Sequence, residues 1–599
     1  MKNNYICTGN EMISLPCIRQ EDGSILDVTI LHMGYKGLID IRGTTKYPLL
    51  RPIVQVDGEE VCFDTIQWER ENYWIPHFEA SSKEIKVTGT VLAPINERGF
   101  AYPICVTNKG NISHKITLGF EGCWSSTYHS INEDKKIEAP VFVYESAWNQ
   151  SLVFDLRIGV SVFAFAPMFG EEMKTQYHQT SEGIFFRFEK EYEIKPGKER
   201  VLDCFFGIGV EEVAATTAAK EMYRFGYEKE RKRTKEWLEK RCLKLSDDSL
   251  QEIFHQNLFF NFFYASGRTI DTEELVLVTS RSPRYYVSAA YWDRDSLLWS
   301  FPSILLADPS YAREMLMYVF GRQRRNFGLH SRYIDGTLLE PGFELDELCA
   351  PVIALSNYIS ATGEKDILDK EEIKEGIALI LRRLNENRHP DIALYQTFLQ
   401  PTDDMHVYPY LTYDNVLVWY VYKCLADLHQ GRWEAETIKA LLDEADAVHQ
   451  AVFANCIKEH QGKQIFAWSV DLEGSRDVYD EPPGSLQLMP FYGFLEAEDP
   501  IYKNTVEVIR SPQYPYSFYG SPIAEIGCPH APHPWVLSIA NSLLCGRLES
   551  SKNILLKLKM DNGVACESVD ENTGESATGD AFATCAGFLA YAIYEAFHK

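Results

Sequence analysis

The chain changes character at residues 211–243, which read EEVAATTAAKEMYRFGYEKERKRTKEWLEKRCL. This stretch contains no proline and consists mostly of good helix formers, so it predicts one long connecting helix. Short β-branched and alternating runs precede it, and helical patterns dominate after it. The predicted domains are therefore a β domain (1–209), a helical linker (210–245) and a helical catalytic domain (246–599).

The part before the linker reads as an antiparallel β-sandwich. Runs such as residues 83–92 and 201–208 alternate in polarity or are rich in β-branched residues. Turn signals such as Asp57-Gly58 and Pro196-Gly197 separate them. Roughly a dozen strands fit this pattern.

The part after the linker predicts an (α/α)6 barrel. Short and long connections alternate between the helical segments, and residues 390–411 and 459–533 form the longest loops. Such helix pairs build an α/α barrel whose long loops gather at one mouth. The predicted helices cover about residues 248–265, 295–306, 310–325, 346–361, 370–386, 412–429, 433–457, 534–547 and 580–597.

Bulk properties exclude several classes of function. The formal charge of −27 repels nucleic acid and anionic membranes, and the basic run at residues 228–241 is interleaved with glutamates like a solvated helix. No targeting segment and no run of about 20 apolar residues is visible, so we expect a cytoplasmic protein. The 14 cysteines are scattered singly without zinc spacing, so we expect no metal and no cofactor.

Two acidic segments far apart in sequence carry carboxylates among apolar residues. Residues 343–349 read FELDELC, and residues 564–570 read VACESVD. A charge in such surroundings is costly unless it has partners or a task. Two carboxylates are what cleavage of a glycosidic bond requires. The alternative is that one acid caps a helix and the other lies in a surface loop.

Several further segments combine aromatic, charged and amide side chains that suit a sugar. Charged groups hold hydroxyls by paired hydrogen bonds, and aromatic rings stack on the apolar faces of sugar rings. Residues 291–295 also fit a capped helix start with a buried Arg/Asp pair. The paired histidines His530 and His533 also fit a metal site. The candidate sugar-binding residues are Tyr291, Trp292, Asp293, Arg294, Asp295, Asp414, Asn415, Asp471, His530 and Trp535.

From about residue 285 onward the chain resembles the metal-independent exo-α-mannosidases of glycoside hydrolase family 125. These belong to the wider group of inverting α/α six-barrel glycosidases that includes glucoamylases. The resemblance rests on an ordered series of segments: 292–296, 343–349 with Tyr358 and 361–363, 470–494, 510–520, 527–530 with Trp535, and 566–568. Two features depart from the family: a β domain precedes the barrel, as in bacterial glucoamylases and disaccharide phosphorylases, and the residues after Glu567 differ.

The resemblance implies that Asp346 is the general acid and Glu567 the general base. Residues 346 and 347 point about 100° apart on a helix, so only one faces a barrel mouth; this leaves Glu344 and Glu347 as substrate contacts or supporting residues. We expect an inverting exo-glycosidase that removes a terminal α-linked sugar, mannose first, from an oligosaccharide. An α-glucosidase, a disaccharide phosphorylase and an inactive sugar-binding protein are the alternatives, and an acid at position 567 favours hydrolysis over phosphorolysis.

Overall fold

The computed structural model describes residues 4–61, 63, 65–158 and 161–598 of the chain. The chain divides into two compact units. The first comprises residues 1–242, 262–276 and 281–289, and the second residues 243–261, 277–280 and 290–599. The predicted linker thus belongs mostly to the first unit, which also takes in two segments from beyond the predicted boundary.

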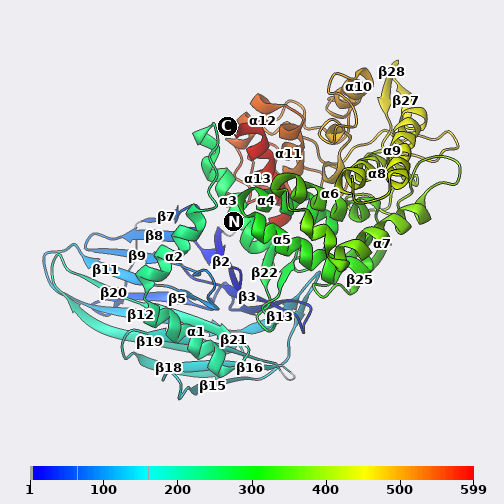
Figure 1. Ribbon diagram of the computed structural model, residues 1–599. Coiled ribbons are helices and arrows are strands. Elements are labelled where there is room, and N and C mark those ends of the chain that lie inside the picture. Colours follow the sequence, from blue (N-terminus) through cyan, green and yellow to red (C-terminus); the bar gives the residue numbers. More distant parts are fainter. Residues whose placement is uncertain (1–3, 62, 64, 159–160, 599) are drawn as a thin grey trace. The chain divides into compact units, whose positions relative to one another are not determined.

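The first unit is built from antiparallel sheets (Figure 1). Within the described residues, the six-stranded sheet has the order β1 (Tyr5–Gly9), β2 (Ile13–Arg19), β3 (Asp27–His32), β4 (Gly37–Arg42), β13 (Ser126–Ser130) and β14 (Asp134–Lys136). One five-stranded sheet has the order β18 (Lys174–Thr180), β19 (Gly183–Ile194), β12 (His114–Trp124), β5 (Arg51–Val56) and β6 (Glu59–Glu60).

Two further sheets of five strands complete this set among the described residues. One has the order β10 (Gly99–Ala101), β21 (Cys204–Gly209), β17 (Ser161–Phe169), β16 (Leu152–Ile158) and β15 (Val141–Glu145). The other has the order β20 (Glu199–Leu202), β11 (Ile104–Asn108), β9 (Ile85–Thr90), β8 (Ile75–Ser81) and β7 (Thr65–Glu71). A short pair, β22 (Ser266–Arg268) and β23 (Leu275–Leu277), follows later in the chain.

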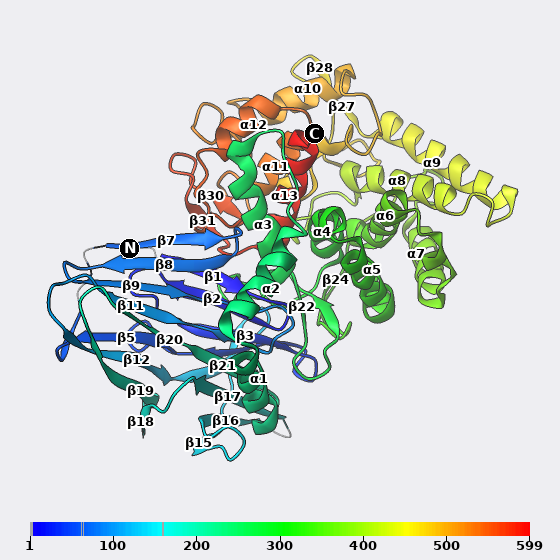
Figure 2. The ribbon, with the colours of Figure 1, turned by 60° about the vertical axis from the view of Figure 1, so that its left-hand side comes forward.

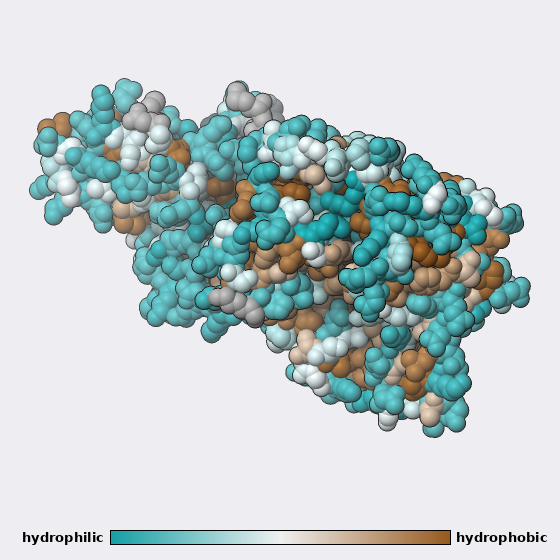
Figure 3. Space-filling model, turned by 90° about the horizontal axis from the view of Figure 1, so that it is seen from above, coloured by the Kyte–Doolittle hydropathy of each residue, from teal (hydrophilic) through white to brown (hydrophobic). Residues whose placement is uncertain are grey.

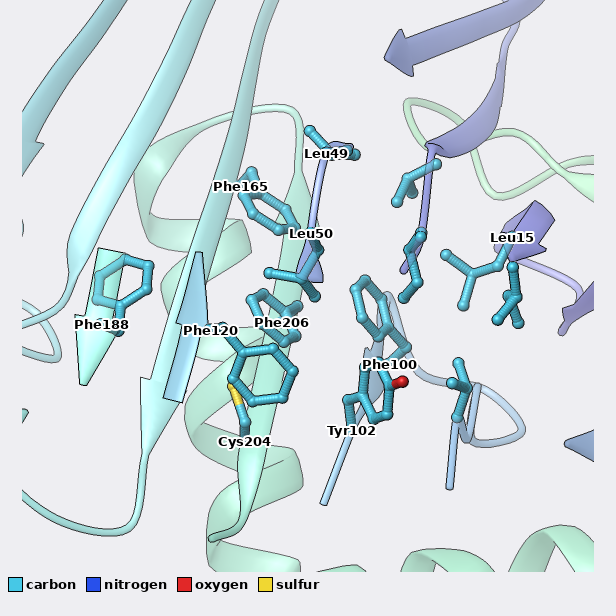
Figure 4. Close-up of a cluster of buried hydrophobic side chains, with 14 of the residues drawn as sticks. Leu15, Leu49, Leu50, Phe100, Tyr102, Phe120, Phe165, Phe188, Cys204 and Phe206 are labelled. Carbon is cyan, nitrogen blue, oxygen red and sulfur yellow. The ribbon is translucent and has the colours of Figure 1, made fainter. Parts of the chain in front are cut away.

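All four of these sheets contribute to one hydrophobic core. Leu15, Phe120, Phe206 and Val106 come one from each sheet and are buried in the same cluster. Figure 4 shows Phe100, Phe120 and Phe206 close together, and the Phe100 and Phe206 rings stack with centroids 4.7 Å apart. An antiparallel β part is therefore confirmed, with more strands than the dozen expected; its description as a sandwich stays a prediction.

The predicted long helix is interrupted at Gly226. Helix α1 (Glu212–Phe225) ends there and α2 (Tyr227–Glu239) begins, because Gly226 adopts φ 91°. Helix α1 packs on β17 and β21, where a side chain at Gly207 would lie 2.0 Å from the carbonyl oxygen of Ala215. The basic cluster of α2 is not a free patch, since Arg231 pairs with Glu71 at 2.6 Å.

The second unit consists mainly of helices (Figure 2). Helices that contact one another in sequence order form an inner ring: α4 (Phe301–Ala307), α6 (Leu345–Thr362), α8 (Thr412–Leu428), the one-turn helix η7 (Leu486–Leu488), α11 (Val536–Leu544) and α13 (Ala583–Phe597). Two contacts between aromatic side chains, Tyr413 with Tyr492 and Trp419 with Phe494, join α8 to the segment after η7. Helix α13 contacts α4, which closes the ring.

Each inner helix is followed or joined by an outer partner. The outer helices are α3 (Gln251–Tyr264), α5 (Pro309–Tyr318), α7 (Glu371–Asn387), α9 (Ala435–Asn455), α10 (Pro500–Ile509) and α12 (Leu548–Leu555). Helices α10 and α12 were not expected; α10 starts with an Asp499 cap and Pro500 inside a stretch that otherwise reads as loop. This alternation of inner and outer helices within the described residues is the predicted (α/α)6 arrangement.

Two-stranded ribbons and a π-helix lie in the connections between the helices. The ribbons are β24 (Leu329–Arg332) with β25 (Leu338–Phe343), β26 (Tyr410–Leu411) with β29 (Ser469–Val470), β27 (Ile457–His460) with β28 (Lys463–Phe466), and β30 (Ser568–Val569) with β31 (Ser576–Thr578). Residues Arg294–Ser300 form the π-helix η2 directly before α4. π-Helical turns are frequent at functional sites.

The surface is mixed in polarity. On the face drawn in Figure 3, hydrophilic residues predominate and hydrophobic ones form patches between them. Among the described residues, no helix is long and apolar enough to cross a membrane.

Candidate active site

Most of the predicted acids lie at the N-terminal ends of the inner helices. Asp293 precedes η2, Asp346 and Glu347 open α6, Asp414 is in the first turn of α8, and Glu567 lies before α13. Because the inner helices run in the same direction, these ends gather at one end of the ring. Helix N-termini also favour negative charge.

Arg294 is the centre of the site. Its Nη1 donates to Glu344 Oε2 at 2.8 Å and to Asp346 Oδ2 at 3.0 Å, and its Nη2 donates to Asp403 Oδ1 at 2.5 Å. The side chain is buried, as are those of Glu344 and Asp346, whereas the Asp403 side chain is 35% exposed. The guanidinium therefore gathers three carboxylates from separate segments, and this surplus of carboxylates raises the pKa of Arg294 although burial alone would lower it.

Glu347 supports the backbone that carries Arg294. Its carboxylate accepts from the backbone N–H of Asp293 at 2.5 Å and from that of Arg294 at 3.0 Å. Arg332 on β24 donates to Asp293 Oδ2 at 2.5 Å and lies 3.3 Å from Glu347. Burial raises the pKa of Glu347 well above its usual range. Glu347 therefore fixes the start of η2, and its Oε1 also lies 3.7 Å from Arg294 Nη2. Asp346 is the acid of this pair that accepts a hydrogen bond from the Arg294 guanidinium.

Asp346 and Glu344 accept from the same guanidinium nitrogen, Arg294 Nη1. Asp346 Oδ1 accepts from the Glu347 N–H at 2.8 Å, which leaves Oδ2 to Arg294. Glu344 Oε1 lies 2.5 Å from His330 Nδ1. Burial would lower the pKa of His330, but its bond to Glu344 and the nearby Asp403 raise it overall.

Glu567 lies in the segment between α12 and α13. Its backbone N–H donates to Gly579, and its carbonyl accepts from Val536 at the start of α11. Its side chain is 3% exposed and accepts from Thr578 Oγ1 at 2.6 Å. His530 Nε2 lies 3.8 Å from Glu567 Oε1, and His530 Nδ1 lies 3.2 Å from Asp404 Oδ2. Glu567 thus has a hydroxyl donor and an imidazole beside it.

Two predicted sugar-binding residues carry buried polar atoms without partners. Among the described residues, no hydrogen-bond partner reaches either carboxylate oxygen of Asp414 or the indole Nε1 of Trp292. Burial and the neighbouring carboxylates of Asp346 and Glu344 raise the pKa of Asp414 well above its usual range. Unpaired buried polar groups are costly, and hydroxyl groups of a ligand can satisfy them.

Other predicted residues have local partners. Tyr291 donates to Asp293 at 2.6 Å, and the Asn415 amide bonds the backbone of Tyr395 and Leu411. Trp535 Nε1 donates to the carbonyl of Ala531. Asp471 accepts from the N–H groups of Glu473 and Ser475 in its own turn, and within the described residues it makes no hydrogen bond or ion pair with the Arg294 cluster. Their sugar contacts stay predictions.

The structure brings to the site five residues that are not among the predicted candidates: His330, Arg332, Asp403, Glu481 and Thr578. The Asp403-Asp404 pair stood out as acidic, and Glu481 stood in an acidic and aromatic run. His330 and Arg332 lie on β24, where the local pattern gives no indication of a site.

One group of side chains has the composition of a metal site. Ligand atoms of His330, Glu344 and Asp403 lie within 4.8 Å of one another. Arg294 already contacts both carboxylates of this trio, so a divalent cation there would meet a guanidinium. The two predicted alternatives, His530 and His533, face Asp404 and Glu571 respectively. The residues therefore fit an ion-paired cluster better than a metal centre.

The sequence was compared with families and curated proteins. Residues 385–594 match the family described as metal-independent alpha-mannosidase, glycoside hydrolase family 125. The C-terminal region is therefore family 125-like. The resemblance read from the residues is confirmed; the matched segment contains Glu567 but begins after Asp346.

A curated protein also resembles part of the chain. The meiotically up-regulated gene 157 protein of Schizosaccharomyces pombe is 28% identical over 196 residues. The match covers 31% of this chain and 38% of that protein, so the chain spans well under half the length of this relative.

Three solved structures are similar in fold. A metal-independent α-mannosidase of Streptococcus pneumoniae, solved with α-1,6-mannobiose in a non-productive complex, has a TM-score of 0.50 at 18% identity over 61% of this chain and 97% of its own. A bacterial glucoamylase complexed with acarbose has a TM-score of 0.66 at 13% identity over 100% and 94% of the two chains. A putative kojibiose phosphorylase from the human microbiome has a TM-score of 0.59 at 13% identity over 99% and 86%.

The Asp295→Asn variant tests the electrostatics of the cluster. Burial raises the pKa of Asp295, which accepts from Thr584 at 2.9 Å, to about 7. A carboxyl with a raised folded-state pKa keeps its proton longer in the folded than in the unfolded chain, so its ionisation costs stability as pH rises from about 4 to about 7. Asn does not titrate. The melting temperature of Asp295→Asn relative to the parent protein should therefore increase between pH 4.5 and pH 7.5, and a constant difference would contradict a raised pKa at Asp295.

Proposed function

We propose that this protein is an inverting exo-glycosidase that removes a terminal α-linked mannose from an oligosaccharide. The observation that carries the proposal is the family 125 match over residues 385–594, joined to the carboxylate cluster around Arg294. The mannobiose bound to the Streptococcus pneumoniae structure supports mannose as the first choice of sugar.

The proposed general acid is Asp346. It protonates the glycosidic oxygen as the bond from that oxygen to the anomeric carbon breaks. Arg294 and the Glu347 N–H fix its two oxygens. Burial and the nearby Asp346 raise the pKa of the neighbouring Asp414 carboxyl. After each turnover the acid must regain a proton.

The proposed general base is Glu567. It accepts a proton from a water molecule as the water oxygen bonds to the anomeric carbon from the face opposite the leaving oxygen. Thr578 orients one carboxylate oxygen, and His530 stands 3.8 Å from the other. An ionised carboxylate between a hydroxyl donor and an imidazole is well placed to take a proton.

Trp292 and Asp414 are proposed to hold the terminal sugar. Trp292 stands edge-on to His330 with ring centroids 5.5 Å apart, and its indole N–H is buried. Among the described residues, both carboxyl oxygens of Asp414 are also buried without a hydrogen-bond partner. A sugar hydroxyl at each group would supply the missing hydrogen bonds.

An α-glucosidase of the glucoamylase kind is the second candidate. The bacterial glucoamylase matches the whole of this chain, including the β unit that the family 125 model does not cover. At 13% identity the likeness concerns the fold and leaves the sugar open. The kojibiose phosphorylase match keeps phosphorolysis as a third outcome of the substrate screen.

Substitution of the two carboxylates tests their roles. Asp346→Asn and Glu567→Gln keep the shape of each side chain but remove its proton chemistry, so each should lower kcat by about two or more orders of magnitude. Measured melting temperatures should stay close to that of the parent protein. Near-parental turnover of Glu567→Gln on an oligosaccharide would rule out Glu567 as the base. Glu344→Gln should be milder, because Glu344 is proposed to support rather than to react.

The stereochemistry of the first product tests both the function and the mechanism. The purified protein is offered aryl α-mannosides, aryl α-glucosides and short manno- and gluco-oligosaccharides, with and without phosphate. Proton NMR of the active reaction, recorded before mutarotation, should show the β-anomer of mannose first, because a single displacement inverts the anomeric carbon. Initial α-anomer would overturn the single displacement, and activity only with phosphate would identify a phosphorylase.

A further inference from the structure

A short turn that contains Asp403 and Asp404 connects the partners of Asp346, the proposed acid, to those of Glu567, the proposed base. Asp403 accepts from Arg294, which in turn binds Asp346. The adjacent Asp404 contacts His530, which stands beside Glu567. Two neighbouring residues of one turn thus reach the partners of the two proposed catalytic carboxylates.

The turn adopts a conformation that needs support. Asp403 has a φ of 66°, in the left-handed region that residues other than glycine rarely adopt. Within the turn, Gln400 N–H donates to the Asp404 carbonyl at 3.0 Å, and Asp403 N–H donates to the Gln400 carbonyl at 2.8 Å. Such a strained residue persists only when its surroundings hold it in place.

Glu481 attaches this turn through Thr402. Its Oε1 accepts from the Thr402 backbone N–H at 2.9 Å, and its Oε2 accepts from Thr402 Oγ1 at 3.0 Å. Tyr479 donates to the same Oε2 at 3.1 Å. Both contacts with Thr402 are made by one fully buried carboxyl group, directly before the strained residue. Hydrogen bonds to charged or buried acceptors are the strong ones.

We propose that Glu481 is a positioning residue of the active site, which sets Asp403 and Asp404 through its two hydrogen bonds to Thr402. This inference rests on the proposed function for the roles of Asp346 and Glu567. Glu481 is assigned no contact with the substrate, since Thr402 and Tyr479 already donate to its two carboxyl oxygens. When these two hydrogen bonds to Thr402 are lost, Asp403 separates from Arg294 and Asp404 separates from His530. The partners of the proposed acid and of the proposed base are then no longer fixed relative to each other.

Hydrogen–deuterium exchange tests whether Glu481 stabilises the turn, independently of any enzymatic activity. In Glu481→Gln, the Thr402 and Asp403 amides should exchange about ten- to a hundredfold faster than in the parent protein, because the amide that replaces the carboxylate cannot accept all three hydrogen bonds. Glu525→Gln is the matched control, since Glu525 is equally buried and accepts from Ser538 and Ser542. It should leave exchange at residues 400–404 unchanged. Equal exchange in Glu481→Gln and the parent would overturn the inference.

Thr402 provides the variant pair if Glu481→Gln does not fold. Thr402→Ser keeps both donors to Glu481, whereas Thr402→Val keeps the shape and loses the hydroxyl donor. Exchange of the Asp403 amide should rise in Thr402→Val and stay at the parental rate in Thr402→Ser. The same rate in both variants would contradict the inference.

A double-mutant cycle tests whether Glu481 acts through the turn. Glu481→Gln should lower kcat on the active substrate by about a hundredfold, the size of effect expected from small misplacement of catalytic groups, with a smaller change in KM. In an Asp403→Asn/Asp404→Asn background the same change should cost little more, because both contacts that Glu481 positions are already lost. Additive losses would show that Glu481 acts independently of Asp403 and Asp404. If the parent protein hydrolyses none of the glycosides, the proposed function fails, while the exchange experiment still decides the positioning role.

Discussion

The site depends on one buried guanidinium that is shared by carboxylates from distant segments. Arg294 binds Glu344, Asp346 and Asp403, and its own backbone is held by Glu347. Separate buried carboxylates would each be expensive, and a single cation that pairs with several of them reduces that cost only when its geometry is fixed. The planar fork of arginine provides that geometry.

The helical unit supplies the positions that this interaction needs. Inner helices that run in the same direction bring their N-terminal ends together, and each end carries an acid or a residue that binds one. The π-helical start of η2 carries Arg294 and Asp295, and the opening turn of α6 carries Asp346 and Glu347. Loops between the helices then add Asp403, His530 and Glu567. The fold and the chemistry are therefore coupled at one end of the ring.

Much of the helical fold and of the acid cluster could be predicted from sequence, because acids inside apolar helical patterns stand out. Asp346 and Glu347 are examples: Asp346 accepts from the Arg294 guanidinium, and Glu347 accepts from the backbone of η2 and lies 3.7 Å from the same guanidinium. Contacts between residues of different elements could not be predicted. The local sequence of β24 does not indicate that His330 contacts Glu344 or that Arg332 contacts Asp293. The linker helix was expected to be continuous, but at Gly226 a backbone with positive φ overrides the good helix formers on both sides. The short helices α10 and α12 were missed, although the Asp499-Pro500 start of α10 is a helix signal that was available.

The central claim is that Arg294 arranges the reacting carboxylates and does more than stabilise the fold. Lysine at this position keeps the charge but cannot hold Glu344, Asp346 and Asp403 with one planar group. The decisive measurement is kcat of Arg294→Lys on the substrate identified for the parent protein, together with the melting temperature of the same preparation. A folded variant whose kcat has fallen by about two orders of magnitude is the predicted result. A destabilised variant that retains parental kcat would show that Arg294 is a structural ion pair and would contradict the account.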